Sequence, residues 1–243
     1  MLKAVFVDYT GTLMEEDGPD VREMVARCCK NSEIGGPKAM MEYWWGMVKA
    51  FEERYSGENY RTEDEIVDEI LAVCTEQIHL RENLDELHGL VHRFWMYSPA
   101  FPDAKEFFAR CPLPVYVITN NSRVYVEEGL RDKGLRPAGI VCGDMARAYK
   151  PHRELFEKAL AVSGCQAEEV VHIGDSVASD VMGAASAGIR PLLLDRRGKG
   201  APEGVEAVRT LNEALGWIER EMGEAHILEE STARPAIPCF VQE

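Results

Sequence analysis

Carboxylates stand at the ends of two short apolar runs in this chain of 243 residues. The run at 4–7 is followed by Asp8, and the run at 170–173 is followed closely by Asp175 and, five residues later, by Asp180. If the three acids meet, they repel each other, and each resists ionisation unless a cation lies among them. Oxygen ligands without histidine or thiol match a hard cation such as Mg²⁺. The pattern therefore predicts a magnesium site formed by these three aspartates.

Uncharged and cationic groups that could hold an anion follow other segments. Thr119 and Asn120 close the apolar run at 114–118, and Lys150 precedes Pro151 just before a helix-like segment. A lysine and the exposed amides at helix starts supply positive potential. Beside a metal ion, these groups predict a pocket for a phosphoryl group, with Thr119, Asn120 and Lys150 as substrate-binding residues.

The apolar runs alternate with helix-like segments, which is typical of a parallel α/β sheet. The runs lie at 4–7, 114–118, 139–142, 170–173 and 191–194, and the helical segments at about 122–134, 151–164, 177–188 and 210–222. Ligands of open parallel sheets bind beyond the carboxyl ends of the strands. The polar residues that close the runs are therefore expected to meet at one edge.

The region at 15–98 contains no strand-like run and predicts several amphipathic helices in succession. Thr62 with Glu65 forms a capping box, Asn83 with Glu86 has similar cap logic, and Pro37 could open a helix running to about residue 55. With 19 acidic and 9 basic residues, this region carries most of the net charge of -15. We predict a helical insertion after the first strand.

The composition of the chain limits the classes of partner that it is expected to bind. The charge of -15, without a basic cluster to offset it, repels nucleic acid and anionic membranes, so neither is expected as a partner. No secretory signal or membrane-spanning run is seen, which indicates a soluble, cytoplasmic enzyme or binding protein. The seven cysteines are odd in number and include no C-x-x-C pair, so reduced thiols are expected. The sequence leaves the oligomeric state and the substrate open.

The order of these motifs resembles the haloacid dehalogenase-like superfamily of phosphatases. The resemblance covers about residues 1–14 and 100–200 and rests on "DYTGT", "VITNN", "KPHRELF" and "GDSVASD". It implies Asp8 as nucleophile, Thr119 as a ligand of a phosphoryl oxygen, and Lys150 as the cation of the third motif. It further implies Asp175 as a metal ligand and Asp180 as support for the metal shell.

The resemblance implies a Rossmann-like core flanked by helices, at 1–14 and 99–223, with an all-helical cap at 15–98 and a C-terminal tail at 224–243. The tail is expected to be extended or packed on the surface. The implied activity is magnesium-dependent hydrolysis of a small phosphorylated metabolite through an aspartyl phosphate. Such caps usually supply specificity, and this one offers four cationic candidates, Arg22, Lys38, Lys49 and Arg54.

Thr10 departs from the family pattern. Phosphatases of this family generally carry a second aspartate there, which protonates the departing alcohol and then activates water. A threonine hydroxyl is too weakly acidic for either task, so turnover is expected to be slow or to use another residue. The main-chain carbonyl of Thr10 could still bind the metal, and Glu15, Glu16 and Asp17 are candidate substitute bases.

Two alternatives stay open. The first is a 2-haloacid dehalogenase, which needs no metal; those enzymes typically have tyrosine where Thr10 stands and lack the pair Gly174-Asp175. The second is a non-catalytic binding protein that keeps the pocket. The intact Asp8, Lys150 and Asp175 argue against the second, because binding alone gains little from a nucleophile.

Several other residues are given structural roles. Ser176 is expected to cap a helix and His172 to lie in the core. The methionines and tryptophans at 40–48 are expected to pack within the insertion or against the core. His88 and His92 stand four apart, but without a nearby cysteine or third ligand we predict no zinc site.

Overall fold

The computed structural model describes residues 1–232 and has a six-stranded parallel sheet at its centre. The strand order is β3-β2-β1-β4-β5-β6 and every pair is parallel, which confirms the predicted α/β class. The strands are β1 (Ala4–Val7), β2 (Val115–Thr119), β3 (Gly139–Cys142), β4 (Val170–Gly174), β5 (Arg190–Leu194) and β6 (Ala207–Val208). The two-residue β6 was not predicted, since it is too short to leave a pattern.

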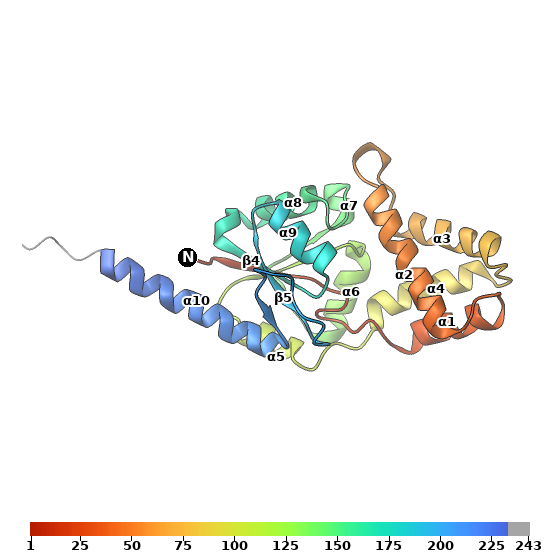
Figure 1. Cartoon of the computed structure of the whole chain (residues 1–243), viewed down its shortest axis with the longest axis horizontal. Helices are drawn as coiled ribbons and strands as arrows, with labels where there is room; N and C mark the ends of the chain where they lie inside the picture. The colour runs from red at the N-terminus through yellow and green to blue at the C-terminus, as the bar shows by residue number, and fades with distance from the viewer. Residues whose placement is uncertain (233–243) are drawn as a thin grey trace, which may run out of the picture.

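Helices cover both faces of this sheet (Figure 1). They are α5 (Ala104–Arg110), α6 (Arg123–Lys133), α7 (Gly143–Ala146), α8 (Arg153–Ser163), α9 (Gly183–Ser186) and α10 (Leu211–Thr232), with a π-helical turn at Val177–Met182 before α9. Side chains of a strand alternate between faces, so Val5 and Val7 join one apolar cluster while Ala4 and Phe6 join the other. The central strand is therefore buried on both sides, as its continuous apolar sequence predicts.

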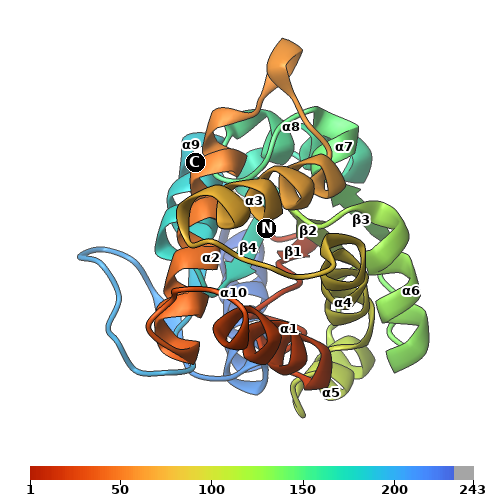
Figure 2. The same cartoon turned by 90° about the vertical axis from the view of Figure 1, so that its right-hand side faces the viewer.

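Four further helices form a separate bundle at one end of the sheet (Figures 1 and 2). They are α1 (Pro19–Lys30), α2 (Pro37–Arg54), α3 (Glu63–Gln77) and α4 (Leu84–Tyr97). Both predicted caps are present, because the Thr62 and Asn83 side chains accept hydrogen bonds from the backbone N–H groups of Glu65 and Glu86. Met40 and Trp44 pack in an apolar cluster shared mainly by these helices. Their division from the sheet as a cap domain remains a prediction.

The two chain segments that enter and leave the bundle lie side by side. Met14 and Ala100 form an antiparallel bridge, and the backbone N–H of Glu15 donates to the carbonyl oxygen of Pro99 at 2.8 Å. The bundle therefore begins and ends at one narrow junction next to the carboxyl end of β1.

The helix predicted at about 210–222 ends later than expected, because α10 continues to Thr232; the first part of the predicted tail, 224–232, is therefore helical and not extended. The segment from 224 to 232 contains three glutamates, one leucine and one alanine, which are good helix formers, and no glycine or proline, so it can extend a helix already begun at Leu211. The rest of the predicted tail, 233–243, lies outside the described residues.

The structure bears on membrane-spanning helices and on the cysteines only within the described residues. Within residues 1–232, no helix combines the length and apolar character needed to cross a bilayer. The six cysteines of this range are free thiols.

Candidate active site

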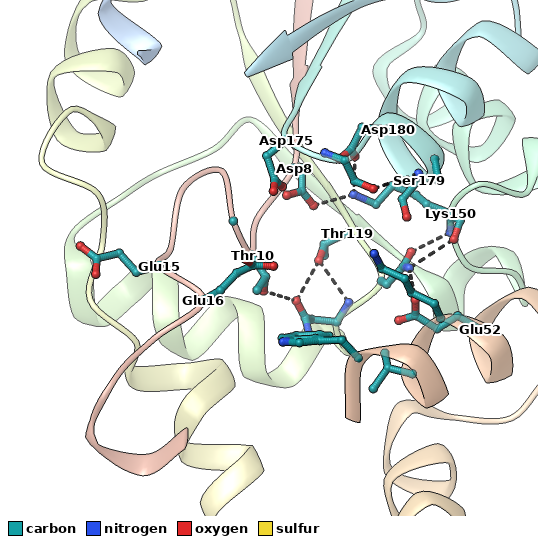
Figure 3. A pocket seen from close by; sticks show the side chains of 18 of the residues that line it. Asp8, Thr10, Glu15, Glu16, Glu52, Thr119, Lys150, Asp175, Ser179 and Asp180 are labelled. Atoms are coloured by element: carbon teal, nitrogen blue, oxygen red, sulfur yellow. Dashed lines mark hydrogen bonds and ion pairs between the residues drawn. The ribbon is translucent and has the colours of Figure 1, made fainter. Parts of the chain in front are cut away.

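The predicted acids meet at the carboxyl edge of the sheet (Figure 3). Asp8 follows the central strand β1, and Asp175 follows the neighbouring β4. Carboxylate oxygens of Asp8, Asp175 and Asp180 lie within 4.8 Å of one another. Asp8 and Asp180 are buried and Asp175 is partly exposed, so the cluster opens to solvent on the side of Asp175.

Lys150 connects two of these acids. Its Nζ atom lies 2.5 Å from Oδ1 of Asp8 and 2.6 Å from Oδ1 of Asp180. Asp180 also contacts His172 Nε2 at 2.9 Å through Oδ1 and accepts from the Ser176 backbone N–H at 3.0 Å through Oδ2. Because both oxygens of Asp180 are occupied within the protein, this residue is placed to hold the lysine and the loop after β4.

Burial and crowding shift the pKa values of the cluster. Burial, together with the charge of Asp180, raises the pKa of Asp8 to about 6 although Lys150 acts against it. Burial and the charge of Asp8 raise the pKa of Asp175 to about 8. For Asp180, burial acts to raise the pKa, but the contacts with Lys150 and His172 together outweigh it and hold the pKa below its usual range. The raised pKa values of Asp8 and Asp175 indicate a site whose negative charge needs another cation.

Gly11 allows Asp175 to lie against the loop after β1. Its φ of +90° is in the region that favours glycine, and a Cβ atom there would lie 2.5 Å from Oδ1 of Asp175. The glycine of "DYTGT" therefore serves both the turn and the approach of the carboxylate.

Thr10 and Thr119 are tied together by Asn121, a residue that sequence reasoning passed over. The hydroxyl groups of Thr10 and Thr119 donate to Oδ1 of Asn121 at 2.8 and 3.2 Å. Nδ2 of Asn121 in turn donates to the buried Glu63 at 2.6 Å. Among the described residues, no hydrogen bond to the carbonyl oxygen of Thr10 is present, so this oxygen is available to a ligand.

Asn120, the predicted substrate contact, links the sheet to the helical bundle. Its Oδ1 accepts from the Lys150 backbone N–H at 2.7 Å, and its Nδ2 donates to Oε2 of Glu52 on α2 at 2.9 Å. Burial raises the pKa of Glu52 to about 7. Sequence reasoning missed Glu52 and Glu63 because both lie on helices of the insertion, and no local pattern marks a residue that meets the site only after folding.

A cleft of about 970 Å³ lies between the sheet edge and the bundle. Its wall includes Asp8, Thr10, Thr119, Lys150 and Asp175 from the sheet side, as well as all three predicted substitute bases, Glu15, Glu16 and Asp17. The structure thus brings every predicted site residue to one cavity; their catalytic and binding roles remain predictions.

Two structural expectations are borne out beside the site. The Ser176 side chain accepts from the backbone N–H of Ser179 at 3.2 Å and caps the helical turn. His172 is fully buried in β4, as expected for a core histidine. Burial lowers the pKa of its imidazole. Its contact with Asp180 makes it part of the support of Lys150.

The sequence model of the family described as haloacid dehalogenase-like hydrolase matches residues 2–188. The chain belongs to this family. A haloacid dehalogenase-like hydrolase domain-containing protein 3 from Danio rerio is 34% identical over 131 residues, which cover 49% of this chain. The alignment spans about half of that relative, 52% of its length. The pyrimidine 5'-nucleotidase YjjG of Escherichia coli (strain K12) is 22% identical over 87% of this chain and 85% of its own.

A solved structure shares the family fold. The crystal structure of an L-2-haloacid dehalogenase matches 90% of this chain and 99% of its own with a TM-score of 0.75 and 17% identity. At this identity the likeness concerns the fold alone. The family is one of hydrolases; a nucleotidase is among the chain's sequence relatives, and a dehalogenase shares its fold.

Proposed function

We propose that this hydrolase cleaves small phosphoric monoesters with Mg²⁺, through an aspartyl phosphate on Asp8. The observation that carries the proposal is the placement of the Lys150 ammonium against Asp8 at 2.5 Å, within a cluster of three carboxylates. A buried cation and a divalent ion together suit the dispersed negative charge of a phosphoryl group in transfer. The nucleotidase relative supports the same reaction class.

The residues present fit a magnesium ion. Their donors are carboxylate oxygens, the ligand type that Mg²⁺ prefers, and the raised pKa values of Asp8 and Asp175 reflect charge that a divalent ion would offset. Asp8, Asp175 and the carbonyl oxygen of Thr10 would hold the ion, with Asp180 in support. When bound, the ion supplies charge stabilisation at the phosphoryl oxygens.

The side chains of the protein act in two successive steps of the proposed reaction. An oxygen of Asp8 attacks phosphorus, the ester P–O bond breaks, and the alcohol leaves with a proton. Water next attacks the aspartyl phosphate, releasing inorganic phosphate and restoring the carboxylate. Lys150 and the Thr119 hydroxyl stabilise the phosphoryl oxygens.

We propose Glu52 as the proton donor in place of the missing aspartate. Thr10 uses its hydroxyl hydrogen on Asn121, and threonine is too weak an acid for the task. Glu52 lines the cleft, and its pKa of about 7 lets the carboxyl hold a proton near neutral pH and release it again. Glu15, Glu16 and Asp17 also line the cleft. The hydrogen bond from Arg22 holds the pKa of Asp17 below its usual range, which does not suit a proton donor.

The dehalogenase alternative is favoured by the fold neighbour with a TM-score of 0.75. In that reaction the same Asp8 oxygen would attack carbon and expel halide without a metal. The carboxylate cluster of Asp8, Asp175 and Asp180 argues against it, because three acids outnumber the single charge of Lys150 between them and would oppose an anionic haloacid.

A screen of phosphorylated metabolites with Mg²⁺ tests the proposal. Release of inorganic phosphate is measured for the native chain and for Asp8→Asn, which keeps the side-chain shape and removes the nucleophile. We expect the variant to be slower by about 10⁴-fold or more. Trapping with hydroxylamine should detect the aspartyl phosphate in the native chain only.

Parallel assays separate the alternatives. Chloride release from 2-chloropropionate without Mg²⁺, lost in Asp8→Asn, would replace the proposal with dehalogenation. Binding of phosphate esters without turnover and without a hydroxylamine-sensitive adduct would instead indicate a binding protein.

A further inference from the structure

A second cluster of metal-ligand side chains lies outside the active-site cleft. His88 and His92 are one turn apart on α4, and Asp64 is in the first turn of the neighbouring α3. One ligand atom from each lies within 4.8 Å of the others. None of the three lines the cleft that holds Asp8. Asp64, from another helix, is therefore a potential third ligand for the pair of histidines, which the sequence alone did not indicate.

The distances suit a tetrahedral ion. Oδ1 of Asp64 lies 3.0 Å from Nε2 of His92 and 3.5 Å from Nε2 of His88. With bonds of about 2.0–2.1 Å, the ligand atoms of a tetrahedral zinc ion are separated by about 3.3 Å. The two observed separations bracket this value without any movement of the helices.

The outer contacts are those of a ligating histidine. Nδ1 of His88 lies 2.7 Å from Oδ1 of Asp68, which is one turn after Asp64 on α3. A carboxylate that accepts the N–H of one ring nitrogen keeps the proton on that nitrogen, so the other ring nitrogen has a free lone pair that can bind a metal. Histidines that bind zinc in proteins have this arrangement. That other atom, Nε2 of His88, is buried and has no hydrogen-bond partner among the described residues. A bound cation would give this atom the partner that it lacks.

We propose that Asp64, His88 and His92 form a binding site for a divalent transition-metal ion of the zinc class. Two imidazole nitrogens and one carboxylate favour such an ion over Mg²⁺, which prefers oxygen ligands. Tyr125 on α6 offers a fourth oxygen, since its hydroxyl lies 2.8 Å from Nε2 of His92 and 3.0 Å from Oδ1 of Asp64. The side chains of His88 and His92 are 15% and 31% exposed, so an ion can enter from solvent.

The site joins three elements. Asp64 belongs to α3, the histidines to α4, and Tyr125 to the sheet-side helix α6, against which α4 packs. An ion here would link α3 to α4 and hold both near α6. Its role is structural, because no group of the active-site cleft is among its ligands.

Metal titration of the native protein tests the site. Metal content after dialysis against Zn²⁺ is compared for the native chain, His88→Gln and His92→Gln, and Co²⁺ is used as a coloured probe of tetrahedral nitrogen ligation. Each variant is expected to lose one equivalent of zinc and the visible Co²⁺ spectrum. Asp68→Asn, which keeps the ligands, should weaken zinc affinity by about 10- to 100-fold.

Matched controls separate this site from the active-site acids. Asp175→Asn should lose magnesium-dependent activity and keep the Co²⁺ spectrum. His79→Asn removes an exposed histidine of the bundle, with an asparagine suited to its φ of 55°, and should bind zinc as the native chain does.

A measurement that needs no variant keeps the test decisive. Anomalous scattering at the zinc edge from crystals soaked in Zn²⁺ should give a peak between the three side chains. An absent peak, or zinc content in His88→Gln equal to that of His79→Asn, would show that the cluster is a hydrogen-bonded network without metal.

Discussion

Thr10 decides how fast the proposed reaction can run. Its hydroxyl donates to Asn121 and cannot activate the water that hydrolyses the aspartyl phosphate, a step for which Glu52 is not proposed. Thr10→Asp should raise the rate of aspartyl phosphate hydrolysis by about 10²- to 10⁴-fold, the usual contribution of acid/base catalysis. Single-turnover kinetics on a substrate found in the screen measures this change. Thr10→Asn, which has similar size and no acidity, is the control; equal rates in both variants would contradict the prediction.

Glu52 predicts a pH dependence with a defined sign. Its pKa of about 7 means that the carboxyl is protonated below pH 7 and can donate, whereas above pH 7 this form is lost. We expect kcat/KM to fall as pH rises through about 7. Glu52→Gln should abolish this fall and lower the rate below pH 7 by about 10²-fold.

The neighbouring Glu53→Gln is the control, since Glu53 is exposed on the same helix and lies outside the cleft wall. An unchanged pH profile in Glu52→Gln would transfer the role to another acid of the cleft.

Gly11 lets the Asp175 carboxylate reach the position in which we propose that it binds Mg²⁺. Alanine there would be strained at φ +90° and would push into the Asp175 carboxylate. Gly11→Ala should destabilise the fold by about 1–3 kcal/mol and weaken Mg²⁺ binding by at least about tenfold. Thermal unfolding and calorimetric titration measure the two effects. Gly35→Ala, at a glycine with open space around it, should change neither; retained Mg²⁺ affinity in Gly11→Ala would be the contrary result.

The sequence revealed only those site residues that sit in local patterns. Asp8 and Asp175 close apolar runs, so parallel-sheet geometry alone predicts that they meet. The sequence favours Asn120 over Asn121 only by its position after Thr119, and nothing in two adjacent asparagines indicates which one contacts Thr10. Glu52 and Glu63 carry no sign at all, since their contacts depend on how the bundle packs.

At the scale of elements, the first turn of α3 anchors the bundle to the loop after β2. Glu63 is buried there and accepts from Asn121 Nδ2 and from the Ser122 backbone N–H, each at 2.6 Å. Burial raises its pKa well above the ordinary value. The folded state therefore keeps a proton that the unfolded chain releases above about pH 4.5, and stability falls as pH rises from there.

Glu63→Gln should remove this pH dependence. The free energy of unfolding of the native chain is expected to lose up to about 1.4 kcal/mol per pH unit from this group, and the variant to lose less. Urea unfolding between pH 5 and 8, extrapolated linearly to zero denaturant at each pH, measures the slope. Glu76→Gln, at an exposed position of the same helix, should keep the native slope; a native slope in Glu63→Gln would refute the assignment.

Helices and strands were predictable from the sequence where an apolar run or a helix-starting residue marked them. The five longer strands follow from continuous apolar runs, and three of the bundle helices, α2, α3 and α4, follow from their starting residues Pro37, Thr62 and Asn83. The end of α10 was placed too early, because its last residues were interpreted without the helix that precedes them. The approach of Asp64 to His88 was not predictable, since it requires the packing of two helices.

At the scale of the molecule, residues of both the sheet side and the bundle line the cleft. Of the four cationic candidates in the insertion, Lys49 alone lines it. Lys49→Gln should raise KM for an anionic substrate by about tenfold, the effect of losing one charged contact of about 1.4 kcal/mol. Steady-state kinetics measures it. Lys38→Gln, on the same helix with a side chain 90% exposed, should leave KM unchanged; equal KM values in the two variants would place recognition elsewhere.

The junction between bundle and sheet has an evolutionary consequence. The segments at Met14 and Ala100 are hydrogen-bonded to each other, so the chain would still leave and re-enter the sheet domain at the same point if everything between them were exchanged. Ancestral genes could thus have exchanged one helical bundle for another at this junction, while the strand order and the acids at the edge of the sheet were retained. Chimeras joined there are a natural way to ask how new substrates were acquired.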